Sequence, residues 1–251
     1  GFSAFEVLSY RWGVASIVLI VFGWLSGCNF RLAGKDWGVV FLLSLLRAVT
    51  SFSLIIAYQN IASGVASTIH FMYPLAVALA MMFFFREKKS LLVILAVLMS
   101  LLGAALLSLG ELEAKSGNTM VGLVAACVSV FSYAGYIVGV RTTRAVQINS
   151  TALTCYVMGL GTIFYLIGAY CTSGLQLVSD GYTWLIILGL ALPATAISNI
   201  TLVQAIKYAG PTLTSILGAM EPLTAVVIGV FVFKELFTVN SAVGIILILL
   251  A

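Results

Sequence analysis

Stretches of about 20 apolar residues recur from one end of this chain to the other, and they leave little choice of fold. A helix that rises 1.5 Å per residue needs about 17–25 apolar residues to cross the hydrocarbon of a bilayer. Only 8% of the residues are charged, whereas a soluble domain carries about 25%. The sequence therefore predicts an all-α polytopic membrane protein with short connections. The predicted segments are 4–26, 37–59, 64–85, 91–109, 120–140, 152–172, 183–206, 212–233 and 239–251.

Basic residues in the connections predict how these segments are oriented, because cytoplasmic loops are enriched in Lys and Arg. If segment 4–26 runs from outside to inside, eight basic residues fall in inner connections and two in outer ones. The inner residues are Arg31, Lys35, Arg86, Lys88, Lys89, Arg141, Arg144 and Lys207, and the outer ones are Lys115 and Lys234. We expect this orientation.

The second half of the chain repeats the first at an offset of 148 positions. Each half has a segment with a central proline, and a basic residue and a glutamate follow at its end. The matched pairs are Ala57 with Ala205, Ser67 with Ser215, Met72 with Met220, Pro74 with Pro222, Leu75 with Leu223, Phe85 with Phe233, Arg86 with Lys234, and Glu87 with Glu235. The loop charges place the first charge pair inside and the second outside. The halves are therefore predicted to be inverted.

An inverted repeat needs an odd number of crossings in each half. The second half supplies five segments and the first supplies four. We therefore expect nine visible helices of ten, with one helix missing before Gly1. The last helix is expected to be truncated at Ala251, since its segment has only thirteen residues. The predicted repeats are 1–110 and 119–251.

A set of short motifs, in their order along the chain, resembles the drug/metabolite transporter superfamily, specifically its EamA-type ten-helix members. The motifs are Tyr10-Arg11, Tyr73-Pro74-Leu75, Glu87, Tyr133-Ala134-Gly135-Tyr136, Glu221-Pro222-Leu223 and Lys234-Glu235. The resemblance covers nearly the whole chain. It implies two inverted five-helix repeats around a central cavity, and transport of amino acids, other metabolites or drugs. Arg47 and His70 depart from the apolar or small residues usual in that family.

Ionisable side chains deep in a membrane segment are costly, so each one is a candidate site residue. The guanidinium of Arg47 matches a substrate carboxylate or phosphate, or else it pairs with Glu221 as a structural latch. Glu221 in turn is a candidate for binding an ammonium group or a proton, or is a structural carboxylate. Arg11 lies nearer the outer surface beside Glu6 and Tyr10, and we expect it to extend toward that surface.

Polar residues on two further segments are predicted to complete the substrate site. His70, the only histidine, is a candidate for proton coupling or a simple hydrogen-bonding residue. Ser198 and Asn199 are predicted to line the cavity, or else to join helices by hydrogen bonds.

Aromatic residues and prolines are the remaining candidates. Tyr73, Tyr133 and Tyr136 form a predicted aromatic wall of the substrate site, or they lie where helices meet headgroups. The predicted helix kinks are at Pro74, Pro193 and Pro222.

Several function classes are disfavoured by missing motifs. The four cysteines lack the close spacing of a metal or redox site, so no metal or cofactor is predicted. No zinc-binding histidine pair, nucleophile elbow or phosphate loop supports an enzyme. The basic residues are dispersed, and this disfavours nucleic acid as a partner.

Inverted repeats of membrane helices are typical of secondary transporters that expose a midplane site alternately to each side. The sequence therefore predicts an exporter of a small polar or amphipathic metabolite, with an amino acid as a candidate substrate. The bilayer and a coupling proton are the other predicted partners, and a bacterial inner membrane is the predicted location. A lipid flippase or scramblase is the alternative, and an intramembrane enzyme a more remote one.

Overall fold

The computed structural model describes residues 3–87, 91–108, 117–172, 174, 176–178, 180–218, 220–232 and 239–250. Within these ranges all regular secondary structure is helical, and each predicted apolar segment is formed by one helix or by consecutive helices, as in 64–85, 183–206 and 212–233. The predicted all-α fold class is confirmed. The described helices that are long and apolar enough to cross a membrane are Ala4–Leu25, Gly34–Asn60, Ser63–Phe84, Thr119–Thr142, Ser150–Thr172 and Gly181–Ala209. A shorter apolar helical stretch, Leu91–Gly103, lies within the helix Leu91–Ser108.

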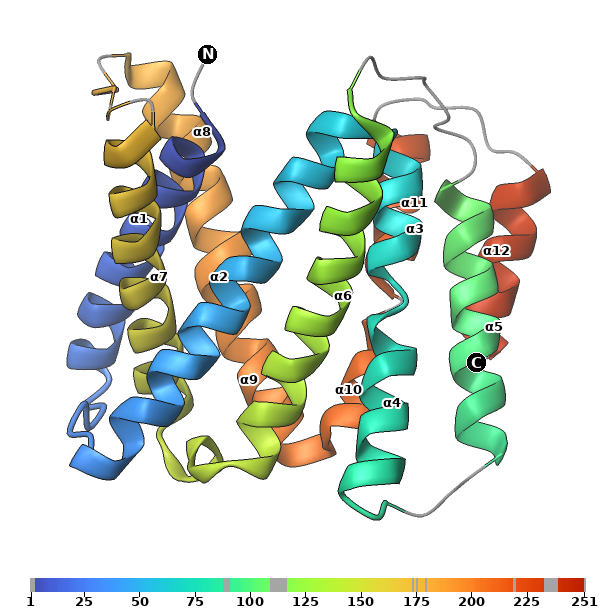
Figure 1. Cartoon of the computed structure of the whole chain (residues 1–251), viewed down its shortest axis with the longest axis horizontal. Helices are drawn as coiled ribbons and strands as arrows, with labels where there is room; N and C mark the ends of the chain where they lie inside the picture. Colours follow the sequence, from blue (N-terminus) through green and yellow to red (C-terminus); the bar gives the residue numbers. More distant parts are fainter. Residues whose placement is uncertain are drawn as a thin grey trace. The chain divides into compact units, whose positions relative to one another are not determined.

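The chain divides into two compact units. Figure 1 shows the chain with colours that follow its sequence. Unit 1 contains Gly1–Phe52 and Gly139–Ala209, and unit 2 contains Ser53–Val138 and Gly210–Ala251. Each unit thus takes helices from both sequence halves. The division at 110 and 119 stays a prediction about sequence repeats, and it does not coincide with the compact units. The two helices that contribute to both units are α2 (Trp37–Asn60) and α6 (Thr119–Thr142).

Unit 1 is built around a pair of repeat-equivalent helices, α1 and α7, which make the largest helix contact in the unit. Gly13 faces Thr162 and Gly159 faces Ser16, so residue numbers rise on one helix as they fall on the other. The two helices are therefore antiparallel, as inverted repeats require. The unit's elements besides the shared helices are α1 (Ala4–Leu25), η1 (Gly34–Asp36), η3 (Arg144–Gln147), α7 (Ser150–Thr172), α8 (Gly181–Ala191), η4 (Leu192–Ile197) and α9 (Ser198–Ala209).

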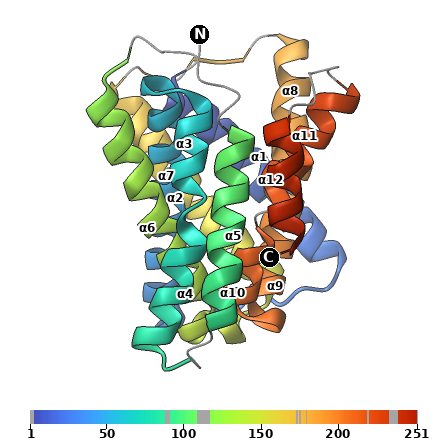
Figure 2. The same ribbon diagram turned by 90° about the vertical axis from the view of Figure 1, so that its right-hand side faces the viewer.

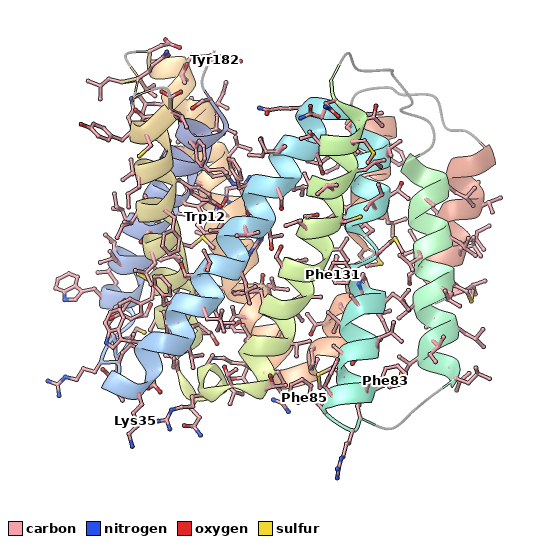
Figure 3. The ribbon with its side chains drawn as sticks, in the orientation of Figure 1. Trp12, Lys35, Phe83, Phe85, Phe131 and Tyr182 are labelled. Carbon is pink, nitrogen blue, oxygen red and sulfur yellow. The ribbon has the colours of Figure 1, made fainter. Side chains whose placement is uncertain are left out.

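Close packing in unit 1 depends on glycines opposite bulky rings. Trp12, labelled in Figure 3, is 1% exposed and meets Tyr165 edge to face with ring centroids 5.1 Å apart. A β-carbon on Gly161 would collide with the Trp12 ring. The small residue on α7 therefore lets the indole fill the space between the two helices.

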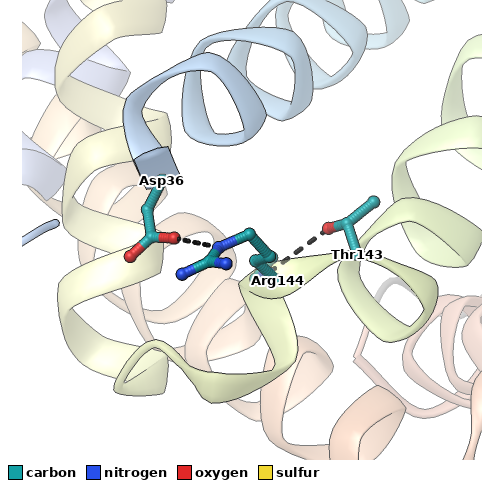
Figure 4. Close-up of polar contacts among 4 residues, drawn as sticks. Asp36, Thr143 and Arg144 are labelled. Carbon is teal, nitrogen blue, oxygen red and sulfur yellow. Dashed lines mark hydrogen bonds and ion pairs between the residues drawn. The ribbon is translucent and has the colours of Figure 1, made fainter. Parts of the chain in front are cut away.

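One end of unit 1 collects basic residues. Arg144 forms an ion pair with Asp36, with Nε and Oδ1 2.7 Å apart (Figure 4). Arg141 donates to the carbonyl of Lys207, and the Lys207 ammonium donates to the carbonyl of Ile148. These contacts join the start of α2, the end of α6 and the end of α9. They bring together residues that the loop charges assign to the cytoplasmic side.

Unit 2 also contains a repeat-equivalent pair, because helix α5 packs on α12. In addition, α4 packs on α10 (Figures 1 and 2). The Thr212 hydroxyl donates to Glu87 Oε2 at 2.7 Å, and this bond joins the end of α4 to the start of α10. The unit's elements besides the shared helices are α3 (Ser63–His70), α4 (Tyr73–Phe84), α5 (Leu91–Ser108), α10 (Pro211–Leu217), α11 (Met220–Val232) and α12 (Val239–Leu250).

Two helices of unit 2 are broken at matching positions. The first break follows His70, between α3 and α4, and the second follows Leu217, between α10 and α11. At the offset of 148, His70 matches Gly218. Pro74 and Pro222 then fall in the first turns of α4 and α11, where a missing N–H breaks no helical hydrogen bond.

The outer faces of the helices carry apolar side chains, as a bilayer requires. Phe83 on α4 and Phe131 on α6 are 67% and 71% exposed and project from unit 2 (Figure 3). Lys35, by contrast, lies at a helix end in unit 1 (Figure 3).

Candidate functional site

The predicted site residues fall into the two units. Arg47, Ser198, Asn199 and Pro193 lie in unit 1. The residues in unit 2 are His70, Tyr73, Pro74, Tyr133, Tyr136, Glu221 and Pro222. Within each unit the structure brings polar residues together around an irregular stretch of helix.

The irregular stretch in unit 1 is η4, a π-helix inside the span formed by α8 and α9. Pro193 has no N–H to donate in this wide turn, and π-turns within α-helices often mark functional sites. Side chains satisfy its backbone carbonyls. Thr195 Oγ1 donates to the Leu190 carbonyl at 2.9 Å, and Asn199 Nδ2 donates to the Thr195 carbonyl at 2.7 Å.

These bonds orient Asn199 and Thr195 as acceptors. With its NH₂ group held by the backbone, Asn199 presents Oδ1 to Arg47, whose Nη2 and Nε donate to it at 3.1 and 3.2 Å. Arg47 Nη1 also donates to Ser51 Oγ at 3.3 Å, one turn along α2. Asn199 is 2% exposed, so the amide holds the guanidinium from inside the unit.

Arg11 corrects one expectation. It does not extend toward the outer surface with Glu6 and Tyr10, because its Nε donates at 2.5 Å to Oγ1 of Thr195, a residue with no exposed surface. Glu6 instead accepts from backbone N–H groups, and Tyr10 donates to the carbonyl of Gln176.

Two guanidinium groups therefore converge on one turn of the same helix. We call Arg11, Arg47, Ser51, Thr195 and Asn199 the arginine cluster. Under the offset of 148, Arg47 matches Thr195 and Ser51 matches Asn199. Arg47 thus bonds both to Ser51 and to its repeat equivalent, Asn199.

The carboxylates of unit 1 are engaged elsewhere. Its acidic residues are Glu6, Asp36 and Asp180. Glu6 accepts from the backbone of Ser3 and Gln176, Asp36 pairs with Arg144, and Asp180 caps α8 through Thr183.

In unit 2, His70 ends α3 and lies among aromatic rings. Its ring stacks on Tyr133 with centroids 5.4 Å apart, and Tyr73 meets Tyr133 edge to face at 4.6 Å. His70 Nδ1 lies 2.9 Å from Ser129 Oγ. The Ser129 hydroxyl also donates to the Ala126 carbonyl, which favours Nδ1–H as the donor to Ser129. We call His70, Tyr73, Ser129 and Tyr133 the histidine cluster.

The two breaks of unit 2 meet at Tyr73. A β-carbon on Gly218 would collide with the Tyr73 hydroxyl, and Tyr73 is only 2% exposed. Gly218 therefore lets the first residue of α4 lie against the break between α10 and α11.

The remaining predicted residues differ in exposure. Tyr136 is completely buried in α6, and Pro74 is also buried. Glu221 is exposed in the first turn of α11, where the positive end of the helix dipole favours a carboxylate. Ser198 is exposed, and its hydroxyl donates to the Ala194 carbonyl at 2.9 Å.

Sequence reasoning missed Thr195, Ser51 and Ser129 as partners of the candidate residues. A signal for Thr195 was present, because it follows Pro193 by two positions and matches Arg47 in the repeat. Ser51 carries a similar repeat signal, because it matches Asn199. Ser129 carries none, since serines are common in apolar helices where they bond to the preceding turn.

Comparisons with known proteins agree with this architecture. The sequence model of the EamA-like transporter family matches residues 1–109 and again 120–251. An uncharacterized transporter of Archaeoglobus fulgidus is 28% identical over 228 residues, which cover 90% of this chain and 79% of that protein. A crystal structure of another protein has a TM-score of 0.84 at 17% identity, over 99% of this chain and 85% of that one. The last likeness concerns the fold alone.

Proposed function

Since the chain belongs to the EamA-like transporter family, we propose that it is a secondary transporter that moves a small polar or amphipathic solute across a membrane by alternating access. The observation that carries this proposal is the pairing of repeat-equivalent helices, α1 with α7 and α5 with α12. In a protein made of two inverted halves, two similar conformations can open to opposite sides of the membrane. Alternating access requires such a pair of conformations.

The breaks at His70 and Gly218, and the π-helix η4, support the same function. Backbone that is irregular at membrane depth is tolerated where it is buried in protein or lines a water-filled path. Polar side chains gather at these places, in the arginine cluster and the histidine cluster. They are the proposed substrate-binding regions.

Finer features of the function rest on the sequence. Export is the proposed direction, and an amino acid is a candidate substrate, because Arg47 matches a carboxylate and Glu221 matches an ammonium group. His70 is the proposed site for a coupling proton, because the imidazole is the side chain whose ordinary pKa lies near neutral pH.

The test is transport by the purified protein in liposomes loaded with a defined mixture of metabolites. We expect at least one solute to leave faster than from protein-free liposomes, as measured by mass spectrometry of the outside medium. A pH gradient of either sign then tests proton coupling. If no solute moves while fluorescent lipids change leaflet, the transporter proposal is wrong and a lipid scramblase replaces it.

A further inference from the structure

One end of unit 1 carries a strong excess of positive charge. Asp36 is the one carboxylate that the structure describes at this end, because Glu6 and Asp180 lie at the starts of α1 and α8. Five basic residues share the end with it, and we call them the basic patch. They are Arg31, Lys35, Arg141, Arg144 and Lys207.

Three members of the basic patch are held around η3. Arg144 lies in η3 and pairs with Asp36 at the start of α2 (Figure 4). The Lys207 ammonium donates to the carbonyl of Ile148, which directly follows η3, and Arg141 donates to the carbonyl of Lys207. The ends of α6 and α9 and the start of α2 therefore bring these charges to one place.

The other two members lie on the connection that leads into α2. Lys35 precedes Asp36 in η1, and its side chain is exposed (Figure 3). Arg31 is exposed next to Phe30, whose carbonyl accepts from the Tyr156 hydroxyl of α7 at 2.6 Å. The side chains of Arg31 and Lys35 form no hydrogen bond with another described residue, so both charges are open to a partner.

The guanidinium groups of the basic patch are only partly used inside the unit. Arg141 bonds through Nη1 alone, and Arg144 bonds through Nε alone, among the residues that the structure describes. The Arg144 side chain is 53% exposed. A guanidinium has five N–H donors, and those that remain can bind the oxygens of a phosphate.

Aromatic residues show the depth at which the basic patch lies. Trp37 follows Asp36 and is 46% exposed, and Tyr208 follows Lys207 and is 88% exposed. Exposed Trp and Tyr at the ends of membrane helices favour the level of the lipid headgroups. The basic patch is therefore placed beside headgroup phosphates.

We propose that the basic patch binds the headgroup of an anionic phospholipid. Its positive charges outnumber its single carboxylate, and an anionic lipid supplies the missing negative charge, whereas a zwitterionic lipid supplies none. The loop charges predict that this end faces the cytoplasm, where anionic lipids attract basic segments. The bound lipid would join α2, α6 and α9, whatever solute the protein moves.

The test compares two lipids added to the purified protein in neutral detergent at low ionic strength. Phosphatidylglycerol is the anionic probe, and phosphatidylcholine has the same phosphate but no net charge. A lipid that binds the folded state raises the melting temperature by mass action. We expect phosphatidylglycerol to stabilise the wild type at a lower mole fraction than phosphatidylcholine. Sodium chloride at about 0.5 M should remove most of the difference, because salt screens exposed charges.

Substitutions then locate the binding site. The double variant Arg31→Gln with Lys35→Gln should need about tenfold more phosphatidylglycerol for the same stabilisation, because each basic residue near the headgroups adds to the attraction. Exchanging the two cations, Arg31→Lys with Lys35→Arg, should keep the wild-type response. Lys88→Gln with Lys89→Gln makes the same charge change in a predicted inner connection of unit 2, and should also keep it.

Several results would overturn the proposal. Equal stabilisation by the two lipids would show that the headgroup charge is not recognised, and an unchanged response of the Arg31→Gln, Lys35→Gln variant would place the lipid elsewhere. An equal loss in the Lys88→Gln, Lys89→Gln variant would indicate general attraction to the whole protein. Stabilisation by inorganic phosphate at the same concentration would make a soluble anion the occupant.

Discussion

Asn199 fixes the geometry of the arginine cluster, because its side-chain amide bonds both to the backbone of the π-helix and to Arg47. Its NH₂ group binds the π-helix backbone at 2.7 Å, and its oxygen binds Arg47 at 3.1 and 3.2 Å. A hydroxyl at this position, or the asparagine side chain in another rotamer, would bond to only one of these two partners. The side chain is therefore specified by hydrogen-bonding capacity as well as by size.

We expect Asn199→Leu to lower the free energy of unfolding by about 1–3 kcal/mol, because it leaves buried polar partners without their bonds. Ser198→Ala, at the neighbouring exposed position, should change it by less than about 0.5 kcal/mol. Unfolding in sodium dodecyl sulfate measures both. Equal losses in the two variants would show that the Asn199 link carries no special stability.

For single residues, the sequence indicates which side chains are candidates for a site, but it does not indicate which residues they contact. Arg47 and Asn199 were identified because polar groups are rare and costly in apolar segments. Arg11 was placed wrongly, since a long side chain in the outer part of a helix can reach either toward the surface or inward. The partner that decides this, Thr195, is 184 residues away in the chain.

The elements of this protein show where a helical pattern stops being regular. Segment bounds could be predicted closely, because the thickness of the hydrocarbon sets the length of each apolar run. The prolines marked the regions of irregularity. The π-turn of η4 could not be predicted, because it depends on which carbonyls side chains such as Thr195 and Asn199 satisfy.

The breaks in unit 2 make a prediction about Gly218. We expect Gly218→Ala to destabilise the protein by about 1–3 kcal/mol, because the added methyl overlaps the Tyr73 hydroxyl in a packed interior. Tyr73→Phe removes that hydroxyl, so the double variant should recover much of the loss in a double-mutant cycle. The measurement is unfolding in sodium dodecyl sulfate.

Gly189 provides the matched control on α8, where a β-carbon meets open space. Gly189→Ala should leave stability unchanged or raise it by about 0.5–1 kcal/mol, because alanine favours the helix. A loss from Gly218→Ala that Tyr73→Phe does not relieve would place the strain elsewhere in the break.

The start of α8 makes a prediction about pH. The Thr183 backbone N–H and hydroxyl both bind the Asp180 carboxylate and lower its pKa below the usual 3.8. A lowered folded-state pKa means that this stabilisation is complete above the unfolded pKa and is lost as pH falls through the folded one. Hydrogen exchange at Thr183, corrected for intrinsic rate, should therefore stay slow at neutral pH and quicken below about pH 4.

Asp180→Asn is the control for this effect. Asparagine also caps helices well but does not titrate. Its protection of Thr183 should be independent of pH across the same range. If both proteins lose protection in parallel, the cause is general unfolding in acid and not the cap.

For the whole molecule, the halves could be recognised from sequence because the same motifs recur at one offset. The grouping of helices into units could not, because it depends on contacts between distant segments. The predicted topology depends on charged residues that lie outside the described ones, namely Lys88, Lys89, Lys115, Lys234 and Glu235. It stays a prediction of the loop charges.

Cysteine labelling tests that topology. In a background without native cysteines, Lys234→Cys should react with an impermeant maleimide in sealed cells. Lys88→Cys should react only after the membrane is permeabilised. The opposite pattern would reverse the orientation, and equal access for both sites would refute the inverted arrangement.

The pairing of α1 with α7 and of α5 with α12 has a consequence for genes that encode one half alone. A half expressed by itself lacks the partner of each of these helices, so neither unit can assemble from one copy. Two fragments divided between residues 110 and 119 should be degraded when made singly and should accumulate when produced together. A lone half can be complete only if a second copy inserts in the opposite orientation and supplies the missing partners.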